Sequence, residues 1–244
     1  MKILALDTAT EACSVALQTE AGVLSQCVPA GRQHTEVLPQ MVAAILAEAG
    51  LTPSALDGLI CGLGPGSFAG LRIGVAYAKG LAAGLGLPLQ GVSSLALLAQ
   101  GAWRKHRAER VLAAIDARME QVYFGVYGVR EGCAQALLAD RVCDPYQVTG
   151  PTSVVSSQRF AGVGTGWARY GSVLLRRFGE IQVTPVDAEA LPEACDALDL
   201  IEPASWASLA VRADVLAPLY LRDRVALTCA EQIAARRPGS PSAS

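Results

Sequence analysis

A buried strand that ends in an aspartate occurs twice in this chain of 244 residues. Residues 3–6 form a continuous apolar run that ends at Asp7, and residues 111–115 form a second run that ends at Asp116. Continuous apolar runs of this length are typical of central strands that are buried on both faces. A short turn and a second strand-like segment follow each aspartate. The pattern therefore predicts two halves that are built alike.

A glycine-rich segment further along each half supports the duplication. Residues 61–66 and residues 161–166 share the order small residue, glycine, apolar residue, glycine, any residue, glycine. The aspartate and the first glycine are 55 positions apart in the first half and 46 apart in the second. A single match could be chance, because glycine marks turns in many proteins. Two features in the same order predict two related lobes, with both aspartates and both glycine segments near one cleft.

This layout is similar to that of the actin, Hsp70 and sugar-kinase superfamily. We therefore expect an α/β protein with two related lobes of the actin-like ATPase (RNase H-like) fold, in which helices flank mixed central sheets. The polar, basic segment 101–110 predicts a boundary between an N-terminal lobe, residues 1–104, and a C-terminal lobe, residues 105–226. The last helical segment of the second lobe is free to pack back on the first, and the tail, residues 227–244, is expected to be partly disordered.

Composition excludes several classes of protein. A hydrophobic content of 52%, a charged content of 17% and a mean hydropathy of +0.34 exclude a disordered chain. A net charge of −2 and a pI near 5.7 argue against a dedicated nucleic-acid binder. The seven cysteines are scattered without a C-x-x-C pair, so neither a disulfide framework nor a zinc site is expected. No transmembrane span or secretory leader is recognised, which favours a cytoplasmic protein with no membrane contact.

Two predicted helices, residues 36–49 and 68–85, carry the interface prediction. In the second helix small residues recur at every fourth position and form a seam with almost no side chain. Gly74 in this seam costs roughly 1 kcal/mol of helix propensity relative to alanine, and a closely packed helix would offset that cost. Packing of both helices on their own sheet is the alternative. We favour a subunit interface formed by Leu38, Met41, Val42, Ile45, Gly70, Gly74, Ala78 and Ala82.

The first glycine segment and the two aspartates form a candidate cofactor site. A glycine-rich turn at a helix start offers N–H groups to an anion, and aspartates at strand ends can hold Mg²⁺ through water. The alternatives are a turn that lets a helix pack closely on a sheet, and aspartates that cap turns. No cofactor is firmly predicted, and ATP with Mg²⁺ is expected only in a complex. The residues of this site would be Asp7, Thr8, Gly64, Gly66, Ser67 and Asp116.

Residues for acid–base or metal chemistry are few. The two histidines, His34 and His106, are 72 positions apart, and no nucleophile–base pair follows from spacing. We therefore predict neither catalytic residues nor a metal site. The rival hypothesis is an ATP-dependent kinase or ATPase that uses Asp7 and Asp116. Direct binding of a nucleic acid ranks last because of the net charge, and it would use Arg72, Lys79, Arg104, Lys105 and Arg107.

Two segments resemble a known family. Ile3 to Leu17 and Gly64 to Gly74 are strongly similar to the bacterial TsaB (YeaZ) family, and the likeness runs from the start of the chain to about residue 226. One departure is Ala69, where the family usually has threonine. The lost hydroxyl weakens the case for phosphate contact beside the loop. Further support comes from residues 101–105, 111–119, 162–167 and 219–223.

The resemblance implies a role in making N6-threonylcarbamoyladenosine at position 37 of tRNAs that read ANN codons. In that family, TsaB is the partner of TsaD, a paralogue of the same fold that carries the metal-binding histidines and transfers the threonylcarbamoyl group. A TsaE-type ATPase joins the complex, and tRNA would be reached only indirectly. The resemblance also places both the TsaD contact and a competing homodimer on the first two helices. An older assignment of the family as a glycoprotease finds no support in these residues.

Overall fold

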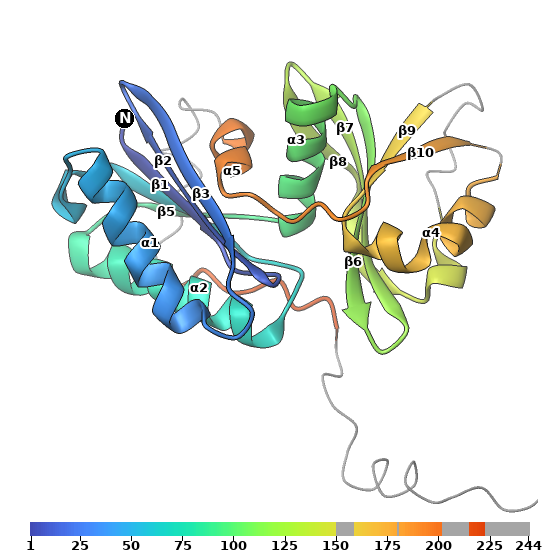
Figure 1. The fold of residues 1–244 in the computed structure, drawn as a ribbon, viewed down its shortest axis with the longest axis horizontal. Coiled ribbons are helices and arrows are strands. Elements are labelled where there is room, and N and C mark those ends of the chain that lie inside the picture. Colours follow the sequence, from blue (N-terminus) through green and yellow to red (C-terminus); the bar gives the residue numbers. More distant parts are fainter. Residues whose placement is uncertain (150–158, 180, 202–214, 223–244) are drawn as a thin grey trace, which may run out of the picture.

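The computed structural model describes residues 1–149, 159–179, 181–201 and 215–222. Its first half forms a five-stranded sheet with the strand order β3-β2-β1-β4-β5 (Figure 1). The central strand β1 pairs antiparallel with β2 and parallel with β4. The strands of this sheet are β1 (Ile3–Asp7), β2 (Ala12–Thr19), β3 (Gly22–Pro29), β4 (Gly58–Gly62) and β5 (Leu89–Val92).

The second half repeats this topology. Its sheet has the order β10-β9-β6-β7-β8, and β6 pairs antiparallel with β7 and parallel with β9. Counted from its own first strand, the second sheet has the same strand order as the first. The predicted duplication and the two-lobed mixed α/β fold are therefore confirmed. The strands are β6 (Arg110–Arg118), β7 (Gln121–Arg130), β8 (Cys133–Cys143), β9 (Arg159–Val163) and β10 (Gln182–Asp187).

Helices cover both sheets and fill the space between them. Two helices pack on one face of the first sheet, two lie between the sheets, and one packs on the outer face of the second (Figure 1). In that order they are α1 (His34–Glu48) and α2 (Phe68–Leu85), then α3 (Ser94–His106) and α5 (Cys195–Leu200), then α4 (Thr165–Arg177). Two short 3₁₀ turns, Pro53–Ala55 and Pro145–Gln147, complete the described elements.

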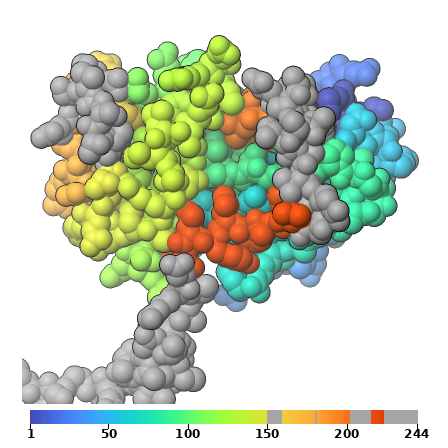
Figure 2. Space-filling view, turned by 180° about the vertical axis from the view of Figure 1, so that it is seen from behind, coloured from blue at the N-terminus to red at the C-terminus, as the bar shows by residue number. Residues whose placement is uncertain are grey.

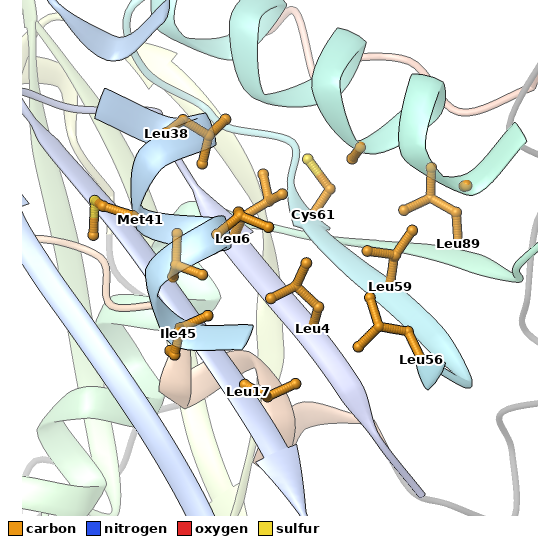
Figure 3. Packing of buried hydrophobic residues seen from close by; sticks show 14 of the residues in the cluster. Leu4, Leu6, Leu17, Leu38, Met41, Ile45, Leu56, Leu59, Cys61 and Leu89 are labelled. Carbon is orange, nitrogen blue, oxygen red and sulfur yellow. The ribbon is translucent and has the colours of Figure 1, made fainter. Parts of the chain in front are cut away.

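The core of the first lobe lies between its sheet and the helices α1 and α2. Leu4, Leu6 and Leu59 of the strands meet Leu38 and Ile45 of α1 (Figure 3). Each of these side chains is almost completely buried, and full burial of one such side chain is worth roughly 1.5–3 kcal/mol. The apolar face of each predicted helix is therefore used to cover its own sheet.

Helix α2 spans the predicted residues 68–85, and Ser67 caps it by accepting a hydrogen bond from the Gly70 N–H group. Helix α1 begins two residues before its predicted start. Among the described residues, no helix combines the length and apolar character that crossing a bilayer requires.

Helix α3 was not predicted, and it lies between the two sheets. The predicted division after residue 104 falls near the end of this helix. Leu95, Leu98 and Ala102 of α3 pack on the second sheet, while Leu97 packs on the first. Residues 185–217 could not be assigned from sequence, and they include the end of β10 and α5. The predicted tail, residues 227–244, lies outside the described residues.

Candidate functional site

Asp7 is buried inside the first lobe, with 1% of its surface exposed. Its Oδ2 atom accepts a 2.7 Å hydrogen bond from Ser94 Oγ, and its Oδ1 atom accepts a 2.9 Å bond from the Ala9 N–H group. A Cβ atom at Gly62 would overlap this carboxylate, so the glycine makes room for it. Burial raises the pKa of Asp7, and the bonds from Ser94 and Ala9 oppose the rise. Asp7 thus joins β1 to the start of α3, which favours the alternative that it is a structural turn residue.

We expect Asp7→Asn to raise the free energy of unfolding at pH 7. Because the folded chain holds this carboxyl proton more tightly than the unfolded chain, stability falls as pH rises from the ordinary pKa of 3.8 through the raised pKa. A neutral asparagine does not lose stability as pH rises, and its side chain can still form hydrogen bonds with Ala9 and Ser94. Urea unfolding should show a larger gain at pH 7 than at pH 4. A variant less stable than the parent at pH 7 would contradict this role.

The glycine segment packs against the β1–β2 turn. The Ser67 N–H group donates a 2.6 Å hydrogen bond to Ala9 O, and Thr8 Oγ1 donates a 2.8 Å bond to Gly70 O. A Cβ atom at Gly66 would overlap Ala9 O, and one at Gly70 would overlap Thr8 O. The glycines therefore allow close packing of two chain segments. The N–H groups of Ser67 and Gly70 are used within the chain, which favours the tight-turn interpretation over an anion site.

Asp116 occupies the equivalent strand end in the second lobe and is paired with arginines. Its Oδ2 atom lies 3.2 Å from Arg118 Nη1 and 3.4 Å from Arg169 Nη1. Its Oδ1 atom accepts a 3.0 Å bond from the Arg118 N–H group, while its own N–H group donates to Thr165 Oγ1. Two guanidinium groups next to this carboxylate repel a cation. Asp116 is therefore poorly suited to hold Mg²⁺.

A cleft of about 720 Å³ lies between the lobes, on the side where residues 215–222 run (Figure 2). Of the six residues predicted for a cofactor, Gly66, Ser67 and Asp116 line this cleft. Asp7 and Thr8 are buried away from it. Gly64 does not line it either, and its carbonyl accepts the Ser94 N–H group. The structure brings together half of the predicted set.

The two predicted carboxylates do not fit the binding of ATP with Mg²⁺ by this chain. Magnesium prefers carboxylate oxygens and water. One of the two predicted carboxylates, Asp7, is enclosed by Ser94 and Ala9, and the other, Asp116, is neutralised by arginines. No step of a phosphoryl transfer can therefore be built on these two groups.

The predicted interface seam faces the interior of its own lobe. A Cβ atom at Gly74 would overlap Thr8 Oγ1, so the glycine serves the contact between α2 and the first sheet. The apolar residues chosen on α1 lie in the same core (Figure 3). The interface prediction is therefore wrong for these residues, since their side chains are covered from within the chain. All eight are buried: Leu38, Met41, Val42, Ile45, Gly70, Gly74, Ala78 and Ala82.

The basic residues considered for direct tRNA contact do not form one patch. Arg104 Nε lies 2.8 Å from Asp196 Oδ1, and Lys105 Nζ lies 2.5 Å from Glu193 Oε1. These pairs hold α3 against the first turn of α5 and against Glu193, which precedes it. The other three are Arg72 and Lys79 on α2, and Arg107 at the end of α3.

Glu193, Cys195 and Asp196 bring three potential metal-ligand atoms within 4.8 Å of one another. Burial, followed by the charge of Asp196, raises the pKa of Cys195 to about 11, so its thiol stays protonated at neutral pH. Both carboxylates are paired with basic side chains. We interpret this cluster as a structural ion-pair network.

Sequence reasoning missed the exposed surface of α1 and α2. The two helices lie side by side on the first sheet (Figure 1). Their outward positions carry small residues, which we call the α1–α2 outer face: Ala43, Ala47, Ala76, Gly80 and Ala83. The sequence did contain a sign of this second surface. Gly80 lies inside the predicted helix but outside the seam, so the seam does not account for a glycine at that position. Exposed and buried small residues recur with the same helical period. The pattern alone therefore could not show whether the seam faces the protein's own sheet or the solvent.

Comparisons with known proteins agree with this fold. The TsaD family model, described as tRNA N6-adenosine threonylcarbamoyltransferase, matches residues 17–239. The tRNA threonylcarbamoyladenosine biosynthesis protein TsaB of Escherichia coli K12 is 41% identical over 232 residues, which cover 93% of this chain and 96% of that protein. Its Haemophilus influenzae counterpart is 39% identical over 92% of this chain and 95% of its own length.

A solved structure is also similar. YeaZ from Pseudomonas aeruginosa has a TM-score of 0.80 and 41% sequence identity, covering 90% of this chain and 99% of that one. The sequence and structure comparisons therefore agree on the family and on the two-lobed fold. The chain belongs to the TsaB (YeaZ) family of proteins of tRNA threonylcarbamoyladenosine biosynthesis.

Proposed function

We propose that this chain is a non-catalytic scaffold and dimerisation subunit of the complex that installs N6-threonylcarbamoyl on adenosine 37 of ANN-decoding tRNAs. It binds and activates a catalytic TsaD-type paralogue in the cytoplasm. A TsaE-type ATPase joins the complex, and tRNA is contacted only through it. Alone, the chain forms a homodimer that competes with the paralogue for the same surface.

Gly80 is the observation that carries this proposal. It lies inside α2 on the α1–α2 outer face, where a Cβ atom would meet no other atom within 4 Å. Glycine in a helix interior costs about 1 kcal/mol relative to alanine. The described part of the chain shows no contact at Gly80 that offsets this cost. A helix of another subunit would offset it, because small residues let two helices approach closely.

The relationship between the chain and its proposed partner favours helix-to-helix pairing. The TsaD family model matches most of this chain, so the two proteins share a fold. A partner of the same fold presents equivalent helices on the equivalent face of its first sheet. Pairing of like faces also explains how a homodimer and a heterodimer can compete, since an isologous interface uses one patch on both subunits.

Sedimentation velocity tests the proposal. Alone, the chain should sediment as a dimer of roughly twice 25.3 kDa. Addition of an equimolar TsaD-type paralogue should replace this dimer with a heterodimer. Two independent species in the mixture would contradict the proposal.

The cleft between the lobes supports a second candidate function, that of a nucleotide-binding ATPase or kinase. The volume of the cleft is within the range of small-molecule sites. The arginine-paired Asp116 disfavours it. We expect titration calorimetry of Mg-ATP into the isolated chain to give no saturable heat, with any Kd weaker than about 1 mM. A micromolar Kd that is lost in Asp116→Ala would support the enzyme instead.

A further inference from the structure

Residues 215–222, which we call the strap, run from the first lobe to the second across the cleft (Figure 2). At its first-lobe end, Leu216 is buried in the core beside α2. The Leu216 carbonyl accepts a 3.0 Å hydrogen bond from Lys79 Nζ, and the Leu219 N–H group donates a 2.8 Å bond to Leu63 O. The strap is therefore fixed to the first lobe through both backbone and side chain.

The middle of the strap packs on the start of α2. The Tyr220 ring lies 5.9 Å from the Phe68 ring, centroid to centroid. Arg72 Nε donates a 3.1 Å bond to Tyr220 Oη, and the Arg72 guanidinium carbon lies 3.8 Å from the Phe68 ring centroid. Arg72 thus holds both aromatic rings. This cluster continues the attachment of the strap to the first lobe.

Arg222 reaches the second lobe. Its Nη2 atom donates a 2.9 Å bond to Ala117 O and a 2.7 Å bond to Gln121 Oε1. Its Nη1 atom lies 3.5 Å from the Met119 sulfur. These contacts enclose the β6–β7 turn from Ala117 to Gln121. One side chain therefore holds both ends of the turn.

This turn has a conformation that its sequence does not favour. Arg118, Met119 and Glu120 have φ values of 60°, 51° and 58°, in the left-handed region. A two-residue hairpin turn with positive φ at both central positions favours Asn-Gly or a similar pair, because other residues clash there. Met119 and Glu120 have no such preference. A bond from outside the turn would offset this cost, and Arg222 bonds the Ala117 carbonyl that precedes the turn.

We propose that the strap clamps the two lobes together and that the Arg222 guanidinium holds the β6–β7 turn in its left-handed conformation. Leu219, Tyr220 and Leu221 of the strap line the cleft together with Arg118 and Met119 of the turn. Release of Arg222 therefore frees the turn and opens the cleft on this side. The strap is a conformational device that acts independently of the α1–α2 outer face.

Hydrogen exchange of the full-length chain tests this proposal. Arg222→Gln should reduce the protection factors of the Arg118 and Leu219 amides, which donate to Asp116 Oδ1 and Leu63 O, at least about tenfold, because it removes the bonds to Ala117 O and Gln121. Protection in α1 and α4 should not change. Arg176→Gln is the matched control, since Arg176 bonds only its own helix at Ser172 O among the described contacts. Unchanged protection in the turn of Arg222→Gln would overturn the proposal.

A compensating change keeps the test decisive if Arg222→Gln folds poorly. Met119→Asn with Glu120→Gly supplies the residues that favour the turn without help. In the Arg222→Gln background, this pair should restore protection of the turn but not of Leu219. Failure of the pair to protect the turn would contradict the role of Arg222, and recovery of Leu219 would contradict the clamp.

Discussion

Replacing Gly74 by alanine is expected to destabilise the isolated chain by about 2–3 kcal/mol, and leucine at this position should prevent folding. The added Cβ atom would overlap Thr8 Oγ1. Thr8 cannot move away without cost, because it is buried and its hydroxyl donates to Gly70 O. The seam therefore contributes to the stability of the first lobe. Urea unfolding followed by circular dichroism measures this loss.

Gly80→Ala is the matched control on the same helix, and its effect should have the opposite sign. A Cβ atom at Gly80 meets no neighbour, so alanine should stabilise the monomeric fold by up to about 1 kcal/mol through helix propensity. Equal effects of the two substitutions would contradict the orientation of α2. A folded Gly74→Leu chain of normal stability would restore the original prediction that the seam faces a partner.

Ala76→Arg is expected to weaken binding of the TsaD-type paralogue at least about 100-fold, a loss near 2.8 kcal/mol. Ala76 belongs to the α1–α2 outer face and is exposed. A long charged side chain at that point keeps two helices from approaching closely. Stability of the monomeric fold should change by less than about 0.5 kcal/mol, as for most surface substitutions, while the homodimer should weaken together with the heterodimer. Titration calorimetry with the paralogue gives the Kd.

Ala168→Arg provides the control for this experiment. Ala168 is an exposed alanine on α4 that lines the cleft between the lobes. Its substitution adds the same side chain on a different helix, so binding of the paralogue should stay near the parent value. Loss of binding in Ala168→Arg with normal binding in Ala76→Arg would move the interface from the outer face to the cleft.

The sequence predicted those parts of the fold that a repeated or periodic pattern determines. The repeated strand, aspartate and glycine segment identified two related lobes because each lobe repeats the same strand order. Helix α2 has the bounds that were predicted, and in the structure Ser67 caps its start while Gly86, in the left-handed conformation, follows its end. Helix α3 was missed because its last turn, Arg104 to His106, belongs to a basic segment that was interpreted as a boundary.

The errors at the site have a different origin. The role of Asp7 depends on Ser94, which is 87 positions away in the sequence. The orientation of the seam depends on Thr8, which packs where Gly74 has no side chain. Sequence periodicity shows which residues share one face of a helix, but it does not identify what that face contacts. For this chain, the glycines that matter for its own fold and those available to a partner differ only by their angle around α2.

The most direct test is the rate of threonylcarbamoyladenosine formation in a mixture of the paralogue, the TsaE-type ATPase, tRNA and this chain. If the chain acts by contact, Asp7→Asn combined with Asp116→Asn should support the parent rate, while Ala76→Arg should lower it to the rate without the chain. A normal rate with Ala76→Arg, together with a loss of activity when both carboxylates are replaced, would show that the chain contributes chemistry instead of a docking surface.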